Sequence, residues 1–211
     1  MTDILLIQPS ARCSAYPTLM DVAAKEPPLW AGLLASYLRG KNIGVEILDA
    51  DALDLPGGQI GQAVADMNPR FAVVVAYGHH PSASTQTMPG ARIALQAIRE
   101  AAPTVRTAIL GGHVSALPRR TLLEEPVDFV IEGEGFYTLE ALALSKEDAD
   151  VPGLWWQDRQ GSVCHTAPAP LLTNLDQEGS PWASLPMSQY RCHNWHRMSA
   201  VVSQTGYASI Y

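Results

Sequence analysis

Cysteine is scarce in this chain, and the spacing of the few cysteines excludes two common uses of the residue. They are Cys13, Cys164 and Cys192. An odd number of widely separated cysteines argues against a disulfide framework and against a Cys-x-x-Cys metal or redox site. We therefore expect reduced thiols. With 47% hydrophobic and 17% charged residues, the chain has enough apolar side chains to bury a core without cross-links.

Basic residues are also few. Against 21 Asp and Glu there are 14 Lys and Arg, which gives a formal net charge of −7. A field of that sign repels a phosphate backbone, so nucleic acid is not an expected partner. Asp3 stands where a signal peptide would carry basic residues, and the apolar run at residues 4–7 is too short for a membrane span. We expect a cytoplasmic protein with no membrane partner.

Three nucleotide and phosphate motifs are missing. The first predicted strand is followed by Gln8-Pro9-Ser10-Ala11-Arg12 instead of Gly-x-Gly-x-x-Gly, which disfavours NAD and FAD. No Gly-x-x-x-x-Gly-Lys-Ser/Thr occurs, so a P-loop is excluded. A phospho-receiver pocket is excluded too, because Asp49 and Asp51 follow the second predicted strand and no lysine ends the fifth.

The apolar residues that are present predict the fold. Short runs without polar alternation recur at residues 4–7, 45–48, 72–76, 108–110 and 129–131, as in strands covered on both faces of a parallel sheet. Segments of helical periodicity separate them, most clearly the apolar stripe between Pro27-Pro28 and Gly40. Strict β-then-α alternation predicts an α/β, doubly wound, Rossmann-like fold of the flavodoxin type, with a five-stranded parallel sheet and helices on both faces.

The pattern changes after residue 150, so we predict a ligand-binding domain over residues 1–150 and an extension over residues 151–211. Trp155-Trp156, a polar turn at residues 158–161 and Val163 predict a small hairpin that extends or covers the sheet. Repeated prolines between residues 167 and 186 predict an extended linker over the surface. Residues 201–211 have the pattern of an incomplete strand.

Ligands of doubly wound folds bind outside the carboxyl ends of the strands. At the ends of the third and fourth predicted strands stand the small residues Ala76, Gly78, Gly111 and Gly112, which leave room for a bulky group near the backbone. A tight strand-to-helix turn explains the Gly-Gly step equally well. Polar groups that fix the orientation of a ligand flank these positions; they are Tyr77, His79, His80, Ser82, Ser84, Thr85, His113 and Ser115.

The fifth predicted strand is followed by Glu132-Gly133-Glu134-Gly135. A glutamate near a helix N-terminus interacts favourably with the helix dipole, which accounts for Glu134 without a ligand. Glu132 is a candidate acceptor for amides or hydroxyls of a ligand. For His113 two interpretations stay open, contact with a ligand or a hydrogen bond to the backbone at the entry of a helix.

Three segments together resemble the N-terminal cobalamin-binding domain of B12-dependent radical SAM enzymes. They are Pro-Pro-Leu-Trp at 27–30, Gly-Gly-His-Val-Ser-Ala-Leu-Pro at 111–118 and Asp-Phe-Val-Ile-Glu-Gly-Glu-Gly at 128–135. The resemblance covers nearly the whole chain, because the hairpin, the linker and the final residues 206–211 resemble the passage into the radical SAM barrel.

The resemblance implies cobalamin as the cofactor and partner. It assigns no catalytic residue and no metal ligand, and it implies these cofactor-binding residues: Pro9, Ser10, Arg12, Tyr77, Gly78, His79, Ser82, Ser84, Gly111, Gly112, His113, Ser115, Glu132, Gly133, Glu134 and Gly135. No Asp-x-His-x-x-Gly motif occurs, so base-off cobalamin without a histidine ligand is implied, with its nucleotide tail buried by the loops after the third and fourth strands. The lower face of cobalt then meets water, nothing, or a residue of the first loop, for which the candidates are Arg12, Cys13, Tyr16 and Met20.

The Cys-x-x-x-Cys-x-x-Cys cluster of the family is expected shortly after Tyr211. S-adenosylmethionine and the [4Fe-4S] centre therefore belong to a radical SAM domain C-terminal to this chain. The resemblance implies that the full-length protein is a methyltransferase in which methylcobalamin gives its methyl group to a substrate radical, and that this chain alone binds without catalysing.

Two other functions remain as alternatives. One is a stand-alone small-molecule enzyme with Glu132, Glu134 or His113 as acid or base, against which stands the lack of a nucleophile–base pair. The other is an interaction module that uses Trp155, Trp156 and the linker. Cys192, His193 and His196 are metal ligands by type but lack the paired spacing of zinc sites.

Overall fold

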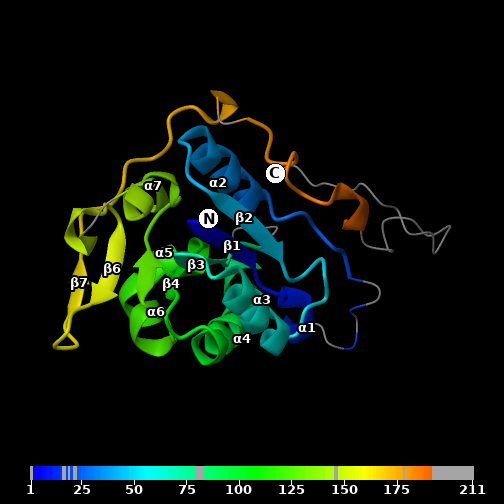
Figure 1. Ribbon diagram of the computed structural model, residues 1–211, viewed down its shortest axis with the longest axis horizontal. Helices are drawn as coiled ribbons and strands as arrows, with labels where there is room; N and C mark the ends of the chain where they lie inside the picture. Colours follow the sequence, from blue (N-terminus) through cyan, green and yellow to red (C-terminus); the bar gives the residue numbers. More distant parts are fainter. Residues whose placement is uncertain are drawn as a thin grey trace.

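The computed structural model describes residues 2–15, 18, 20, 23–78, 83–144, 147–177 and 179–191. A central sheet lies between two layers of helices (Figure 1). All five predicted strands are present and pair in parallel in the order β2-β1-β3-β4-β5, which is the flavodoxin-type order. They are β1 (Ile4–Gln8), β2 (Val45–Asp49), β3 (Phe71–Val75), β4 (Arg106–Leu110) and β5 (Phe129–Ile131).

The sheet has seven strands, not the five predicted, because the hairpin joins it. Strand β6 (Leu154–Gln157) pairs antiparallel with β5, and β7 (Val163–His165) pairs antiparallel with β6. Without β6, strand β5 would expose a row of unpaired backbone groups at the edge of the sheet. Figure 1 shows the hairpin at the end of the sheet opposite to β2. The domain boundary at residue 150 stays a prediction.

Helices cover both faces of the sheet, as predicted. Alternate side chains of each strand point to opposite faces, so Ile4 and Leu6 pack in one core cluster while Leu5 and Ile7 pack in the other. The first face is covered by α2 (Leu29–Gly40) and α7 (Phe136–Leu144). The second is covered by α3 (Gly57–Met67), α4 (Ser84–Ala101) and α6 (Pro118–Glu124).

Two short helices were not predicted, α1 (Ala11–Ala15) and α5 (Gly112–Ala116). A helix of about one turn has too few residues to show a period of 3.6 in its sequence. Both begin at the carboxyl edge of the sheet, where β1 and β4 end. They therefore occupy the region in which a doubly wound fold binds its ligand.

The predicted linker contains no strand among its described residues and is held against α2. Gly32 of α2 lies so close to Pro181 that an added Cβ would be 2.4 Å from the Pro181 carbonyl oxygen. Four residues after the predicted linker, Tyr190 is fully buried. In Figure 1 the segment leaves the β6–β7 hairpin and passes over α2. The predicted linker thus runs over the surface, as expected, and packs on the domain at Pro181 and Leu185.

Candidate functional site

The loops after β3 and β4 are joined at the carboxyl edge of the sheet. The Ser84 hydroxyl donates to the Ala76 carbonyl (2.5 Å) and accepts from the His113 backbone N–H (3.0 Å). Gly111 passes so close to β3 that an added Cβ would lie 2.4 Å from the Ala76 carbonyl oxygen. Gly78 is also closely packed, because an added Cβ would lie 2.5 Å from the Cβ of Ala83. Close backbone packing therefore accounts for the small residues Gly78 and Gly111.

His113 enters α5 with its ring at the rim. Its backbone N–H donates to the Ser84 hydroxyl, so the hydrogen bond at the helix entry is made by the main chain of His113 and not by its ring. Its ring is held as well, since Nδ1 lies 3.1 Å from the Thr85 hydroxyl. Within the part of the chain that the structure describes, no second partner of the ring is found. Thr85 thus orients the imidazole through Nδ1.

The loops after β3, β4 and β5 meet at Gly133. Its backbone N–H donates to the Ser115 hydroxyl (3.0 Å), and its carbonyl accepts from the Tyr77 phenol (3.4 Å). Gly133 has φ of +93°, and no atom lies within 4 Å of the place where a Cβ would stand. This junction of three loops faces open space, and its polar atoms are neutral.

Trp30 forms an aromatic wall of this junction that sequence reasoning missed. Its ring stacks on Tyr77 with centroids 4.5 Å apart and planes 18° apart. In the sequence Trp30 belonged to the apolar stripe and to the Pro-Pro-Leu-Trp segment of the resemblance, but it was not among the predicted cofactor-binding residues. Burial, and secondarily the charge of Glu134, raises the pKa of Tyr77 to about 12. Tyr77 is therefore a hydrogen-bond donor at neutral pH, not a base.

Glu132 and Glu134 have protein partners. Glu132 accepts from the indole N–H of Trp155 (2.7 Å), and Glu134 accepts from the Leu172 backbone N–H (2.8 Å). The two carboxylates thereby tie the loop after β5 to the hairpin and to the linker.

Arg12 is buried in a charged cluster between the loops after β1 and β2. Its Nε donates to a carboxylate oxygen of Asp51 (2.9 Å), and one terminal nitrogen donates to Asp54 (2.5 Å) and to the Asp51 carbonyl (2.7 Å). The other terminal nitrogen donates to the Met20 carbonyl (3.1 Å). Arg12 therefore holds the loop after β1 against the loop after β2, through four side-chain hydrogen bonds.

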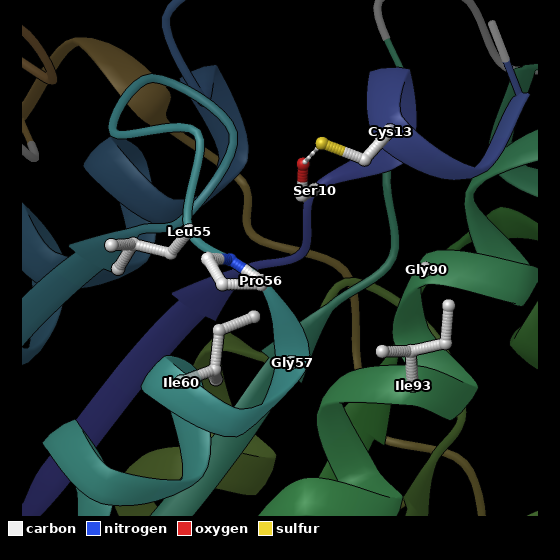
Figure 2. Close-up of a pocket in the computed structure, with 8 residues that line it drawn as sticks. All are labelled: Ser10, Cys13, Leu55, Pro56, Gly57, Ile60, Gly90 and Ile93. Carbon is white, nitrogen blue, oxygen red and sulfur yellow. Dashed lines mark hydrogen bonds between the residues drawn. The ribbon is translucent and has the colours of Figure 1, made fainter. Parts of the chain in front are cut away.

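A cavity of about 220 Å³ lies at the same edge, between α1, α3 and α4 (Figure 2). Two residues of the loop after β1 line it, Ser10 and Cys13, joined by a hydrogen bond of 2.9 Å. The other lining residues are mainly apolar: Leu55, Pro56, Gly57, Ile60, Gly90 and Ile93. Pro9 is buried beside Ser10. The cavity is on the α3–α4 face, whereas Trp30 and Tyr77 pack on the α2–α7 face.

Several candidates lie outside the described residues: His79, Ser82 and Tyr16, and also Cys192, His193, His196 and residues 201–211. Among the residues that are described, no group of three or more His, Cys, Asp or Glu side chains is arranged to hold a metal ion. The helices within the described ranges include none long and apolar enough to cross a membrane.

Asp49 is a buried carboxyl group at the end of β2. It is 5% exposed, and it accepts from the Ala52 backbone N–H (2.9 Å) and from the Tyr190 phenol (2.8 Å). Burial raises the pKa of Asp49 to about 6; the hydrogen bonds from Ala52 and Tyr190 oppose this shift, and the charge of Asp51 adds to it. Asp49 is therefore a carboxyl group that titrates close to neutral pH.

This raised pKa predicts a pH dependence of stability. Between about pH 4 and pH 6 the folded protein binds a proton at Asp49 that the unfolded chain releases. The stabilisation is fully present below about pH 4 and is lost as the pH rises through 6, about 3 kcal/mol in total. The free energy of unfolding of the wild type relative to that of Asp49→Asn, both measured with urea from pH 4 to 8, is expected to fall by up to this amount as the pH rises. A difference that stays constant with pH would contradict the assignment.

A family model described as a B12 binding domain matches residues 18–143, which is more than half of the chain. Among curated proteins, the chain is 35% identical over 81 residues to a cytidylyl-2-hydroxyethylphosphonate methyltransferase from Streptomyces wedmorensis. That match covers 36% of this chain and 15% of the methyltransferase.

Two solved structures share the fold. The first is the radical S-adenosylmethionine methyltransferase TsrM from Kitasatospora setae, with a TM-score of 0.62 and 18% identity over 79% of this chain and 30% of TsrM. The second is the cobalamin-dependent S-adenosylmethionine radical enzyme OxsB, with a TM-score of 0.60 and 18% identity over 80% of this chain and 22% of OxsB. The chain therefore spans less than a third of the length of these proteins.

Proposed function

Since the chain belongs to the B12-binding domain family, we propose that it holds cobalamin over the carboxyl edge of the sheet, with the nucleotide tail beside the loops after β3, β4 and β5. The observation that carries this placement is the junction at Gly133, where three loops meet and face open space. The resemblance seen in the sequence and the family match agree on cobalamin as the ligand.

The residues at this junction fit the cofactor by their chemistry. Cobalamin carries many neutral amide side chains on its corrin ring, and neutral donors and acceptors suit amides. The Tyr77 phenol, the Ser115 hydroxyl, the His113 imidazole and the open Gly133 backbone supply such groups. Arg12, Glu132 and Glu134 support the loops through protein partners, which are Asp51 and Asp54 for Arg12, the Trp155 indole for Glu132 and the Leu172 backbone for Glu134.

We propose that the cofactor is bound base-off and without a histidine ligand from the loop after β1. Residues 8–26 contain no histidine. The guanidinium of Arg12 is directed to Asp51 and Asp54, so within the described part of this loop the side chains of Cys13 and Met20 remain as candidates for the lower face of cobalt.

The full-length protein is proposed to be a B12-dependent radical SAM methyltransferase. The similarity to TsrM, to OxsB and to the curated methyltransferase supports this, together with the small share of their length that this chain covers. S-adenosylmethionine and the [4Fe-4S] centre then belong to a following domain. Bound methylcobalamin supplies a methyl group on cobalt; the residues of this chain bind the cofactor, orient it and shield it from water.

Mixing with hydroxocobalamin tests the proposal. After incubation and desalting, the visible spectrum of the chain is expected to show one base-off corrin per chain, and a colourless protein would contradict cobalamin binding. Gly112→Val, which places a β-branched side chain at the start of α5, is expected to abolish retention while the far-UV circular dichroism stays unchanged. Gly58→Val is the matched control, because a Cβ there meets no atom within 4 Å and lies on α3. Full retention by Gly112→Val would contradict the placement of the tail.

A further inference from the structure

Tyr190 is buried although it belongs to the proline-rich segment that leaves the domain. It is 0% exposed, and its ring packs with Leu185 and Ala52. Its phenol donates to Asp49 at 2.8 Å. A tyrosine and a carboxyl group that are both buried need each other, because either polar group alone would lose its hydrogen bond without gaining water. The segment is therefore anchored at the end of β2.

Arg191 continues the anchor to the loop between α1 and α2. Its backbone exchanges two hydrogen bonds with Lys25, at 3.0 and 2.9 Å, in an isolated antiparallel bridge. Its side chain donates to the Met20 carbonyl (3.2 Å), which also accepts from Arg12 (3.1 Å). Arg191 thus contacts two residues of the loop that follows β1, Lys25 and Met20, while Tyr190 contacts Asp49 at the end of β2.

The contacts around the loop after β2 complete the connection. Lys25 donates to the Ala52 carbonyl (2.8 Å) and to Asp54 (2.5 Å), and Asp54 also binds Arg12. Asp49, which accepts from Tyr190, holds the Ala52 N–H with its other oxygen. A continuous set of hydrogen bonds therefore leads from Tyr190 to Arg12 in α1.

We propose that Tyr190 and Arg191 are positioning residues for the cobalamin site: by anchoring the exit segment they hold the loop after β1 in the conformation that accepts the cofactor. This inference rests on the proposed function, because that loop lies at the edge over which the corrin is placed. It assigns a binding role to Tyr190 and Arg191, which lie just beyond the predicted linker and were not among the candidate site residues. The loop after β1 and residues 190–191 are thereby held together.

The test compares Tyr190→Phe with Tyr37→Phe. Tyr190→Phe keeps the packed ring and removes only the hydrogen bond to Asp49. Tyr37→Phe is the matched control: Tyr37 is 2% exposed and donates to the carboxylate of Glu140, and it lies near the C-terminal end of α2, away from the loop after β1. The affinity for hydroxocobalamin is expected to fall on the order of tenfold in Tyr190→Phe, because a smaller fraction of molecules has the binding-competent loop. It is expected to stay unchanged in Tyr37→Phe.

Hydrogen exchange gives a second measurement that does not depend on the cofactor. In Tyr190→Phe the backbone amides of Ala52, Lys25 and Arg191 are expected to exchange faster, while that of Ile109 in β4 keeps its protection. Arg191→Ala, which removes the side-chain contact to Met20, is expected to act in the same direction if Tyr190→Phe does not fold. Unchanged affinity in the folded variant overturns this proposal, whatever the exchange shows. Absence of binding by the wild type would instead overturn the proposed function.

Discussion

Replacing Arg12 with alanine is expected to lower the free energy of unfolding by about 3–5 kcal/mol, because it leaves a buried carboxylate without its partner. Arg12 is 6% exposed and Asp51 is 8% exposed, and the guanidinium is the group that neutralises Asp51. Breaking one side of a buried ion pair costs far more than the net worth of the pair, since the remaining charge stays out of water. Urea denaturation measures the loss.

Arg120→Ala is the control for this substitution. Arg120 pairs with Glu124 one turn further along α6, and the two side chains are 66% and 50% exposed. An exposed pair of this kind contributes less than about 1 kcal/mol. Similar costs for the two alanine variants would show that the cluster around Arg12 is not the anchor described above.

Replacing Gly111 with alanine is the second substitution with a large expected effect. A Cβ at this position would lie 2.4 Å from the carbonyl oxygen and 2.8 Å from the carbonyl carbon of Ala76, which are backbone atoms of the adjacent strand end. They cannot move without breaking the Ala76 N–H bond to the Leu110 carbonyl (2.7 Å). Gly111 also has φ of +155°, which is unfavourable for alanine. The steric clash and the backbone conformation together are expected to lower the free energy of unfolding by about 3–5 kcal/mol.

Gly133→Ala separates the two causes. Gly133 also has a positive φ, +93°, but its Cβ would meet no atom within 4 Å. Only the backbone conformation is penalised there, at about 1–2 kcal/mol. The midpoint of urea unfolding is expected to fall clearly more in Gly111→Ala than in Gly133→Ala, at equal m-value. Equal shifts would indicate that backbone strain alone explains both glycines.

The strands and long helices were predictable because local pattern and burial agree. Residues 4–7 are fully buried, and an uninterrupted apolar run is what a strand covered on both faces requires. For β2 the predicted burial on both faces was less exact, because Glu46 is exposed. This strand is the last of the sheet on its side, and which strand takes an edge is decided by pairing, not by composition.

The partners of the candidate site residues were not predictable. Arg12 meets Asp51 39 positions away, Glu132 meets Trp155 23 positions away, and Glu134 meets the Leu172 backbone 38 positions away. From the sequence, each of these side chains could equally contact a ligand or hold two loops together. Only the fold shows which second segment lies beside it. The same holds for Gly111, whose close neighbour Ala76 directly follows β3.

The sequence by itself determined the fold class, the positions of the five parallel strands and the resemblance to cobalamin-binding domains, because buried apolar runs and short motifs are local properties of the chain. Only the tertiary structure decided that the hairpin completes the sheet, that Arg12, Glu132 and Glu134 hold loops together, and that the exit segment is anchored by Tyr190. These outcomes depend on hydrogen bonds between distant segments, whose strength comes from the burial that folding creates.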